Sequence, residues 1–289
     1  MTDTQRETIE TCRLVTPQGV AIAYDRFGTG SPLVLVHGSF SDHRSNWQFV
    51  APDFARHFTI HALARRGRGK TDATGGHSVY DEAADVAALI AAIDGRVHLL
   101  GHSYGALVAL EGAVHAPDRI AKLVLYEPPI PGIVTPATLA ALDARAAARD
   151  WEGFTETFLR EVVSVTEAEL AAFRESPLWP QFVADARATT HEVGLPGFSF
   201  DPDRYTELKM PVMLQVGTET QGDYWATDAL ADVLPNARIA ELSNQGHDAM
   251  FTAPDLYARQ VIDFLRGSVT SPGQDPRVQI DPTTMETQS

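Results

Sequence analysis

The chain has 289 residues, of which 44% are hydrophobic and 21% are charged, and its net charge at pH 7 is −15. This length suits one α/β domain with an insertion, and it allows a core large enough to need no disulfide or metal crosslinks. The acidic balance argues against nucleic acid and anionic membranes as partners. Cys12 is the only cysteine, which excludes an intrachain disulfide, and no Cys/His cluster has zinc spacing.

The start of the chain does not predict an export segment, and its apolar runs do not predict a membrane span. The first ten residues, MTDTQRETIE, are polar and lack the apolar stretch of a signal peptide. No apolar run reaches the ~18 residues that a membrane helix needs. We therefore expect a cytoplasmic protein.

Short apolar runs alternate with helical stretches along the chain. The predicted strands are 12–17, 20–26, 32–36, 57–63, 96–101, 120–126, 211–217 and 237–242. Several of these runs are continuously apolar, which is typical of parallel strands that are covered on both faces. The alternation predicts an α/β fold with a mostly parallel eight-stranded sheet flanked by helices and joined by right-handed crossovers.

Two helices are marked by clear end signals. Ser78 and Asp81 form a capping-box pattern that opens one helix. Near the end of the chain, Thr252-Ala-Pro-Asp255 opens another, and Gly267 is its predicted stop. Apolar residues fall on one face of each, so both helices are expected to pack on the sheet.

The segment 128–207 breaks the strand–helix rhythm. It contains about four helical stretches and no convincing strand, and prolines mark its start and its return. We interpret it as a helical cap inserted after the sixth strand, with the core formed by 1–127 and 208–267. Residues 268–289 are polar and rich in turn formers, which predicts a mobile C-terminal tail.

The strongest motif is GHSYG at 101–105, which directly follows the run RVHLLG and opens the helical stretch ALVALEGAVHA. A G-x-S-x-G motif between a strand and a helix is the pattern of a nucleophile elbow, in which the serine stands on a strained turn above the sheet. The helix N-terminus behind it favours developing negative charge. Ser103 is therefore the predicted nucleophile, and His102 is expected to support the elbow.

A serine hydroxyl needs a general base, and His247 is the best placed of the ten histidines. It lies in SNQGHD directly after the last predicted strand. The carboxyl ends of parallel strands share one edge, so His247 is expected on the same rim as Ser103. His37 and His43 compete less well because they lie on the loop that should form the oxyanion site.

The acid that orients the imidazole has more than one candidate. Glu127 follows the run IAKLVLY and is expected to emerge beside the nucleophile strand. Glu219 and Asp223 follow the run PVMLQVG, where Thr220 occupies the place at which many such enzymes carry the acid. We favour Glu127 and keep Glu219 and Asp223 as alternatives.

The loop HGSF at 37–40 follows the run PLVLV. In proteins with this elbow, such a loop supplies one backbone N–H to the oxyanion, and the residue after the nucleophile supplies the other. We assign the donors to Ser39 and Tyr104, with Phe40 as the alternative to Ser39.

Taken together, HGSF at 37–40, RRGRG at 65–69, GHSYG at 101–105, YEPP at 126–129 and NQGH at 244–247 resemble the cap-bearing branch of the α/β-hydrolase superfamily. The resemblance spans residues 12–267. It implies the α/β-hydrolase fold and a serine hydrolase that uses no metal and no organic cofactor. An acid after the strand that follows the elbow resembles a known minority variant, which supports Glu127.

The chain departs from the family pattern at one loop. The usual D-x-R-G-x-G begins here with Ala64, which leaves open how the loop 64–69 is braced. The serine in the elbow also argues against epoxide hydrolases and haloalkane dehalogenases, similar folds that use an aspartate nucleophile.

The expected reaction is two-step acyl transfer on a carboxylic ester or lactone. We expect a small to medium, mostly apolar substrate as the partner, and a homodimer is compatible with the sequence. Arg44 and Arg65 are candidates to hold a substrate carboxylate. The predicted substrate contacts are Phe40, Trp47, Trp151 and Met250. The same triad also serves C–C bond hydrolases, acyltransferases, perhydrolases and hydrolase-like ligand receptors.

Overall fold

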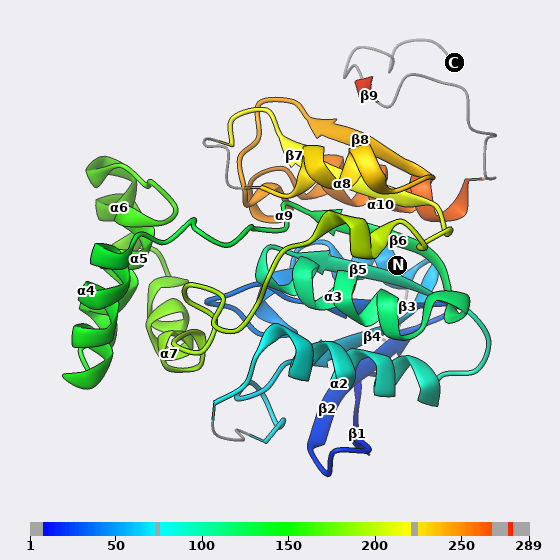
Figure 1. Ribbon diagram of the computed structural model, residues 1–289, viewed down its shortest axis with the longest axis horizontal. Coiled ribbons are helices and arrows are strands. Elements are labelled where there is room, and N and C mark those ends of the chain that lie inside the picture. The colour runs from blue at the N-terminus through cyan, green and yellow to red at the C-terminus, as the bar shows by residue number, and fades with distance from the viewer. Residues whose placement is uncertain (1–7, 73–75, 221–224, 268–276, 280–289) are drawn as a thin grey trace, which may run out of the picture.

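A computed structural model describes residues 8–72, 76–220, 225–267 and 277–279. One sheet runs through the molecule in the strand order β1-β2-β4-β3-β5-β6-β7-β8-β9 (Figure 1). The β1–β2 and β2–β4 pairs are antiparallel, and every other pair is parallel. The strands are β1 (Glu10–Val15), β2 (Ala21–Gly28), β3 (Ser31–Val36), β4 (Phe58–Ala64), β5 (Val97–His102), β6 (Ile120–Tyr126), β7 (Val212–Gly217), β8 (Ala237–Leu242) and β9 (Arg277–Gln279).

All eight predicted strands are present, and their ends agree with the prediction to within about two residues. The addition is β9, which comes from the segment predicted as a mobile tail and pairs in parallel with β8. Without β9, the outer side of β8 would leave its backbone N–H and C=O groups unpaired, and such an edge readily accepts another strand. The other residues of the predicted tail lie outside the described residues.

Helices cover both faces of the sheet because most of its strands are apolar on both sides. One core cluster joins the sheet to α2 (Val79–Ala92), α3 (Tyr104–His115) and α8 (Thr227–Val233). The other joins it to α1 (Ala51–Ala55) and α10 (Pro254–Arg266). The shorter elements are η1 (Ser45–Trp47), η2 (Pro117–Arg119), η3 (Pro202–Tyr205) and α9 (Ala249–Thr252).

The helix-end predictions had mixed outcomes. Ser78 and Asp81 form the predicted capping box at the start of α2. The last helix ends at Gly267 as predicted, but Thr252 does not cap it. The helix begins at Pro254, and the Thr252 hydroxyl instead donates to the side chain of Gln245 at 2.7 Å. Thr252 therefore ties the last helical region to the loop before His247.

Four helices lie between β6 and β7, in the segment predicted as the cap. They are α4 (Pro136–Ala147), α5 (Trp151–Glu161), α6 (Glu167–Arg174) and α7 (Trp179–Thr189), and they gather beyond one end of the sheet (Figure 1). Their apolar faces form two clusters, one of which also contains Phe40 from the loop after β3. Within the described ranges, no helix has both the length and the apolar character to cross a membrane.

Candidate active site

Ser103 stands on the turn between β5 and α3, with φ 55° and ψ −127°. Strand and helix approach so closely here that a Cβ at Gly101 would overlap the carbonyl oxygen of Gly105, and one at Gly105 would overlap that of His37. The Ser103 amide donates to the Tyr126 carbonyl at 2.8 Å, which ties the turn to β6. The half-buried serine is thereby held at the N-terminus of α3, where the helix dipole favours negative charge.

His247 and Glu127 form a direct pair. The imidazole Nδ1 lies 2.5 Å from Glu127 Oε2, and the second carboxylate oxygen accepts the Gly217 N–H at 2.7 Å. Glu127 follows β6 directly and its side chain is fully buried, whereas the His247 side chain is 16% exposed. Because the carboxyl ends of these parallel strands meet at one edge, residues distant in sequence come together here.

The environment of His247 favours its charged form. Burial by itself lowers the pKa of the imidazole, but the hydrogen bond and negative charge of Glu127 outweigh that effect and raise the pKa above its ordinary value of 6.5. A base with a raised pKa takes up a proton more readily. The carboxylate also fixes the ring tautomer, since it accepts the Nδ1 proton and leaves Nε2 available.

The structure distinguishes the two described candidate acids. Glu219 is exposed after the end of β7, and its backbone N–H donates to the Gln245 carbonyl at 2.8 Å. Glu127 is the one of the two whose carboxylate contacts the imidazole. Asp223, the third candidate, lies outside the described residues.

Two aromatic side chains flank the imidazole. The ring of His102 lies 4.7 Å from that of His247, centroid to centroid, and its Nε2 donates to the His247 carbonyl at 3.1 Å. Burial holds the pKa of His102 well below its ordinary value, so the ring is neutral at neutral pH. Trp225 stacks on His247 at 4.6 Å with 26° between the ring planes. Because His102 precedes Ser103 in the chain, these contacts hold the imidazole loop beside the elbow.

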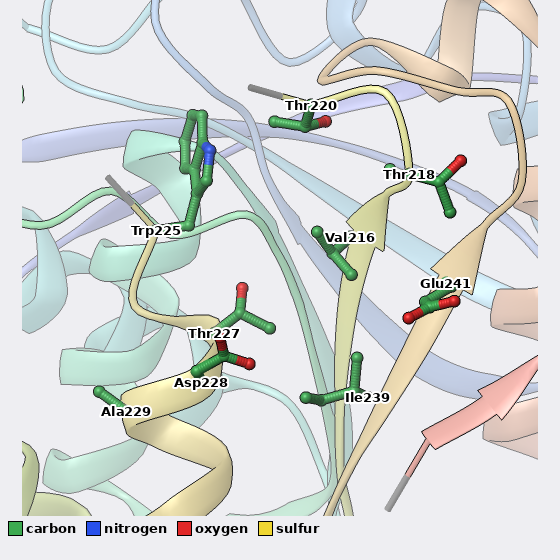
Figure 2. A pocket seen from close by; sticks show the side chains of 10 residues that line it. Val216, Thr218, Thr220, Trp225, Thr227, Asp228, Ala229, Ile239 and Glu241 are labelled. Carbon is green, nitrogen blue, oxygen red and sulfur yellow. The ribbon is translucent and has the colours of Figure 1, made fainter. Parts of the chain in front are cut away.

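Trp225 also borders a cavity of about 530 Å³. Figure 2 shows the indole at one side of this cavity, above the side chains of β7 and β8 and the start of α8. The Trp225 ring therefore stacks on the imidazole and also forms part of the cavity wall. The other lining residues are Val216, Gly217, Thr218, Thr220, Thr227, Asp228, Ala229, Ile239 and Glu241.

The loop after β3, which contains the predicted oxyanion donors, is held from two sides. On the core side, the Gly38 N–H donates to Asn46 Oδ1 at 3.2 Å. On the side of the α4–α7 segment, the Ser39 hydroxyl donates to Glu192 Oε2 at 2.5 Å, and the Phe40 N–H donates to Thr189 Oγ1 at 3.1 Å. The Phe40 amide, the alternative donor, is thus engaged with Thr189.

The loop 64–69 is braced without the usual aspartate. The Arg65 N–H donates to His37 Nε2 at 3.2 Å. Four ion pairs, made by three arginines, brace the loop instead: Arg65 pairs with Glu82 and Glu192, Arg66 with Asp85, and Arg68 with Glu192. The arginines are buried. Arg65 also lies over the Tyr104 ring at 4.7 Å, so this loop supports the residue that follows the nucleophile.

The four predicted substrate contacts lie in packed surroundings. Trp47 and Met250 are 1% exposed and belong to the core cluster that joins the sheet to α1 and α10. Phe40 is buried among aromatic side chains of the α4–α7 segment, and the half-buried Trp151 packs on one of these, Phe154. Contact with a substrate therefore stays a prediction for all four.

The two arginines proposed to hold a substrate carboxylate already have partners. Arg44 binds Asp25 through Nε at 2.6 Å. Arg65 is fully buried between Glu82 and Glu192. Neither guanidinium is aimed at the cavity beside Trp225, whose lining contains neither residue.

Sequence reasoning missed four residues that support this region: Asn46, Thr189, Glu192 and Trp225. The RRGRG motif could have indicated a buried acidic partner, since buried arginines are paired. Nothing in the sequence distinguishes Glu192 from the other acidic residues of its segment. Among the described residues, no group of three or more His, Cys, Asp or Glu side chains is placed to hold a metal ion.

Comparisons with known proteins agree with the fold. Residues 33–260 match the Alpha/beta hydrolase family. A non-heme chloroperoxidase of Streptomyces lividans is 30% identical over 88% of this chain and 99% of its own length. A 2-hydroxy-6-oxo-2,4-heptadienoate hydrolase of Pseudomonas putida is 34% identical over 39% of this chain, and the match spans 43% of that relative.

A solved structure gives the same result over the whole fold. The crystal structure of an alpha/beta hydrolase from Sphaerobacter thermophilus has a TM-score of 0.77 and 30% identity, and the match covers 88% of this chain and all of that one. The family match, the sheet topology and these relatives together show that the chain belongs to the alpha/beta hydrolase family.

Proposed function

We propose that this protein is a serine hydrolase that cleaves a carboxylic ester or lactone through an acyl-enzyme on Ser103. The observation that carries the proposal is the His247–Glu127 pair at the strand edge where Ser103 stands on its turn. A buried carboxylate that accepts the Nδ1 proton of an imidazole is the arrangement that activates a serine hydroxyl.

In the proposed reaction, His247 Nε2 takes the hydroxyl proton as Ser103 Oγ attacks the substrate carbonyl. Glu127 keeps its charge and stabilises the imidazolium that forms. The Ser39 and Tyr104 amides stabilise the tetrahedral oxyanion, and each donor is worth about 3 kcal/mol in such sites. His247 then protonates the leaving alcohol. Water activated by the same ring attacks the acyl-enzyme, which releases the acid and the free serine.

The surroundings of the oxyanion loop favour an apolar substrate of small to medium size. Phe40 packs against Phe154, Phe158 and Phe182, so the side chains next to the loop are aromatic. An apolar acyl or alcohol group placed beside these side chains would gain from apolar burial.

The test uses p-nitrophenyl esters of increasing acyl length and the variant Ser103→Ala. We expect the wild type to release p-nitrophenol and to gain the mass of a fluorophosphonate on Ser103. The variant should lose both properties while it keeps the wild-type circular dichroism spectrum. Full ester hydrolysis by a folded Ser103→Ala protein would rule the proposal out.

Perhydrolysis is a second candidate, supported by the chloroperoxidase that covers most of this chain. Here hydrogen peroxide, rather than water, would attack the acyl-enzyme, giving a peracid and the free serine. Peracid formation from acetate and hydrogen peroxide, followed by bromide oxidation, tests it. If Ser103→Ala removes ester hydrolysis and the wild type forms no peracid, perhydrolysis is ruled out and ester or lactone hydrolysis remains.

A further inference from the structure

We infer that the segment Thr189–Glu192, at the end of the α4–α7 insertion, sets the conformation of the oxyanion loop, and that Glu192 is the positioning residue. The inference rests on the proposed function, because it concerns the loop that supplies the Ser39 amide. None of the contacts involved belongs to the Ser103–His247–Glu127 group itself.

Glu192 is a buried residue of the insertion whose carboxylate binds residues of the core. Its side chain is 1% exposed. One oxygen, Oε1, binds Arg65 Nη2 at 2.8 Å and Arg68 Nη1 at 2.5 Å. The other oxygen, Oε2, accepts the Ser39 hydroxyl at 2.5 Å. A single carboxylate thus connects the insertion to the arginine loop and to the residue whose amide we assign to the oxyanion.

Thr189 supplies a second connection three residues earlier. Its hydroxyl accepts the Phe40 N–H at 3.1 Å and the Arg68 Nη2 at 3.1 Å. Phe40 has φ 51°, a left-handed conformation that is uncommon for a large side chain. Its ring lies among the aromatic side chains of the insertion. Backbone and side chain of the oxyanion loop are therefore both held by the insertion.

The chemistry of the contact makes it sensitive to displacement. Arg65, Arg68, Glu82 and Glu192 form a buried group with two positive and two negative charges. Such a group is stable when every partner is in place, and removing one partner leaves an unpaired buried charge. Separation of the insertion from the core would therefore be disfavoured, and it would release the Ser39 hydroxyl at the same time.

The position of the loop matters because an oxyanion donor works only when it is aimed at the developing charge. A donor that is lost costs about 10²- to 10³-fold in kcat, and a displacement of about 1 Å can cost 10²-fold. A loop without its Glu192 contact still contains the Ser39 N–H, but this group no longer points at the oxyanion. The expected loss is thus smaller than that of removing the donor, and it falls on kcat.

The experiment compares Glu192→Gln with Glu111→Gln. Glu111 is the matched control, because it is equally buried and binds Arg204 Nη2 at 3.0 Å, but it contacts neither the oxyanion loop nor the site. The readouts are kcat and KM for p-nitrophenyl butyrate, the melting temperature, and inhibition by an alkyl trifluoromethyl ketone, which forms a hemiketal oxyanion on an active serine.

We expect Glu192→Gln to lower kcat about 10- to 100-fold with KM within threefold, and to weaken the ketone in the same proportion. Glu111→Gln should lower the melting temperature with kcat within twofold. A Glu192→Gln protein that is folded and has wild-type kcat and ketone inhibition overturns the inference. Equal kcat losses in both variants overturn it too, since the effect would then be general destabilisation.

Ser39→Ala decides the question if Glu192→Gln does not fold. It removes the hydroxyl that Glu192 holds and leaves every charge paired and the amide in place. We expect kcat to fall about tenfold or more, because the loop loses the contact that positions the Ser39 amide. Wild-type kcat in a folded Ser39→Ala protein overturns the inference. If Ser103→Ala is inactive at the same time, the proposed function still stands. An active Ser103→Ala protein overturns both the inference and the proposed function.

Discussion

Glu127→Gln is the substitution that examines the candidate site most directly. Glutamine has nearly the same shape and can still accept the Gly217 N–H. It carries no charge, however, and it would turn its amide NH₂ group toward His247 Nδ1. The ring would then hold its proton on Nε2, the atom that must take the proton of Ser103.

The magnitude follows from the geometry. The carboxylate is fully buried and 2.5 Å from Nδ1, which places the two charge centres about 4 Å apart. With an effective dielectric constant of ~20, the attraction between imidazolium and carboxylate is roughly 4 kcal/mol. Each 1.36 kcal/mol is tenfold in rate, so kcat should fall about 10³-fold. The wrong tautomer moves the loss toward the ~10⁴-fold seen when a triad aspartate becomes asparagine.

The assay is steady-state hydrolysis of p-nitrophenyl butyrate, with circular dichroism to establish folding. Glu219→Gln is the control, because this exposed carboxylate follows the neighbouring strand and was the alternative acid. Its kcat should stay within twofold of wild type. If instead Glu219→Gln loses activity and folded Glu127→Gln keeps it, the assignment of the acid is refuted.

Arg65→Met removes the arginine partner of the buried Glu82 and one of the two arginine partners of Glu192. It should lower the free energy of unfolding in urea by about 3–5 kcal/mol, whereas an unchanged urea midpoint would contradict the buried network. Gly105→Ala should give little folded protein, since its Cβ would overlap a strand carbonyl, while Gly246→Ala, whose Cβ meets nothing within 4 Å, should melt and express like wild type.

The sheet and the elbow were predictable from the sequence because they follow from local patterns. Continuous apolar runs indicate parallel strands, and the two glycines around Ser103 are required where the strand and helix backbones nearly touch. The placement of Glu127 and His247 on one rim needs only the rule that parallel strands end at the same edge. The pairing of the two side chains was therefore within reach of sequence reasoning.

Other features depend on side-chain direction or on distant contacts. Trp47 follows the oxyanion loop closely in the sequence, yet its indole is buried in the core. Its loop is too short for a periodic pattern to indicate this direction. Glu192 lies 153 residues from Ser39, and their contact depends on how an inserted helical segment folds back. Thr252 resembles a helix cap, but a side-chain contact with Gln245 takes its hydroxyl. Such choices are made by tertiary packing.

The backbone conformations at the strand edge have a consequence for how stable this protein can become. Ser103 and Glu127 both have positive φ, at 55° and 45°, although neither is glycine. Conformations of this kind cost on the order of 1–3 kcal/mol each. Glycine would adopt them freely but would remove the hydroxyl or the carboxylate, so selection for heat resistance and selection for turnover oppose one another at these two positions. Gains in thermal tolerance that preserve catalysis must come from elsewhere in the chain.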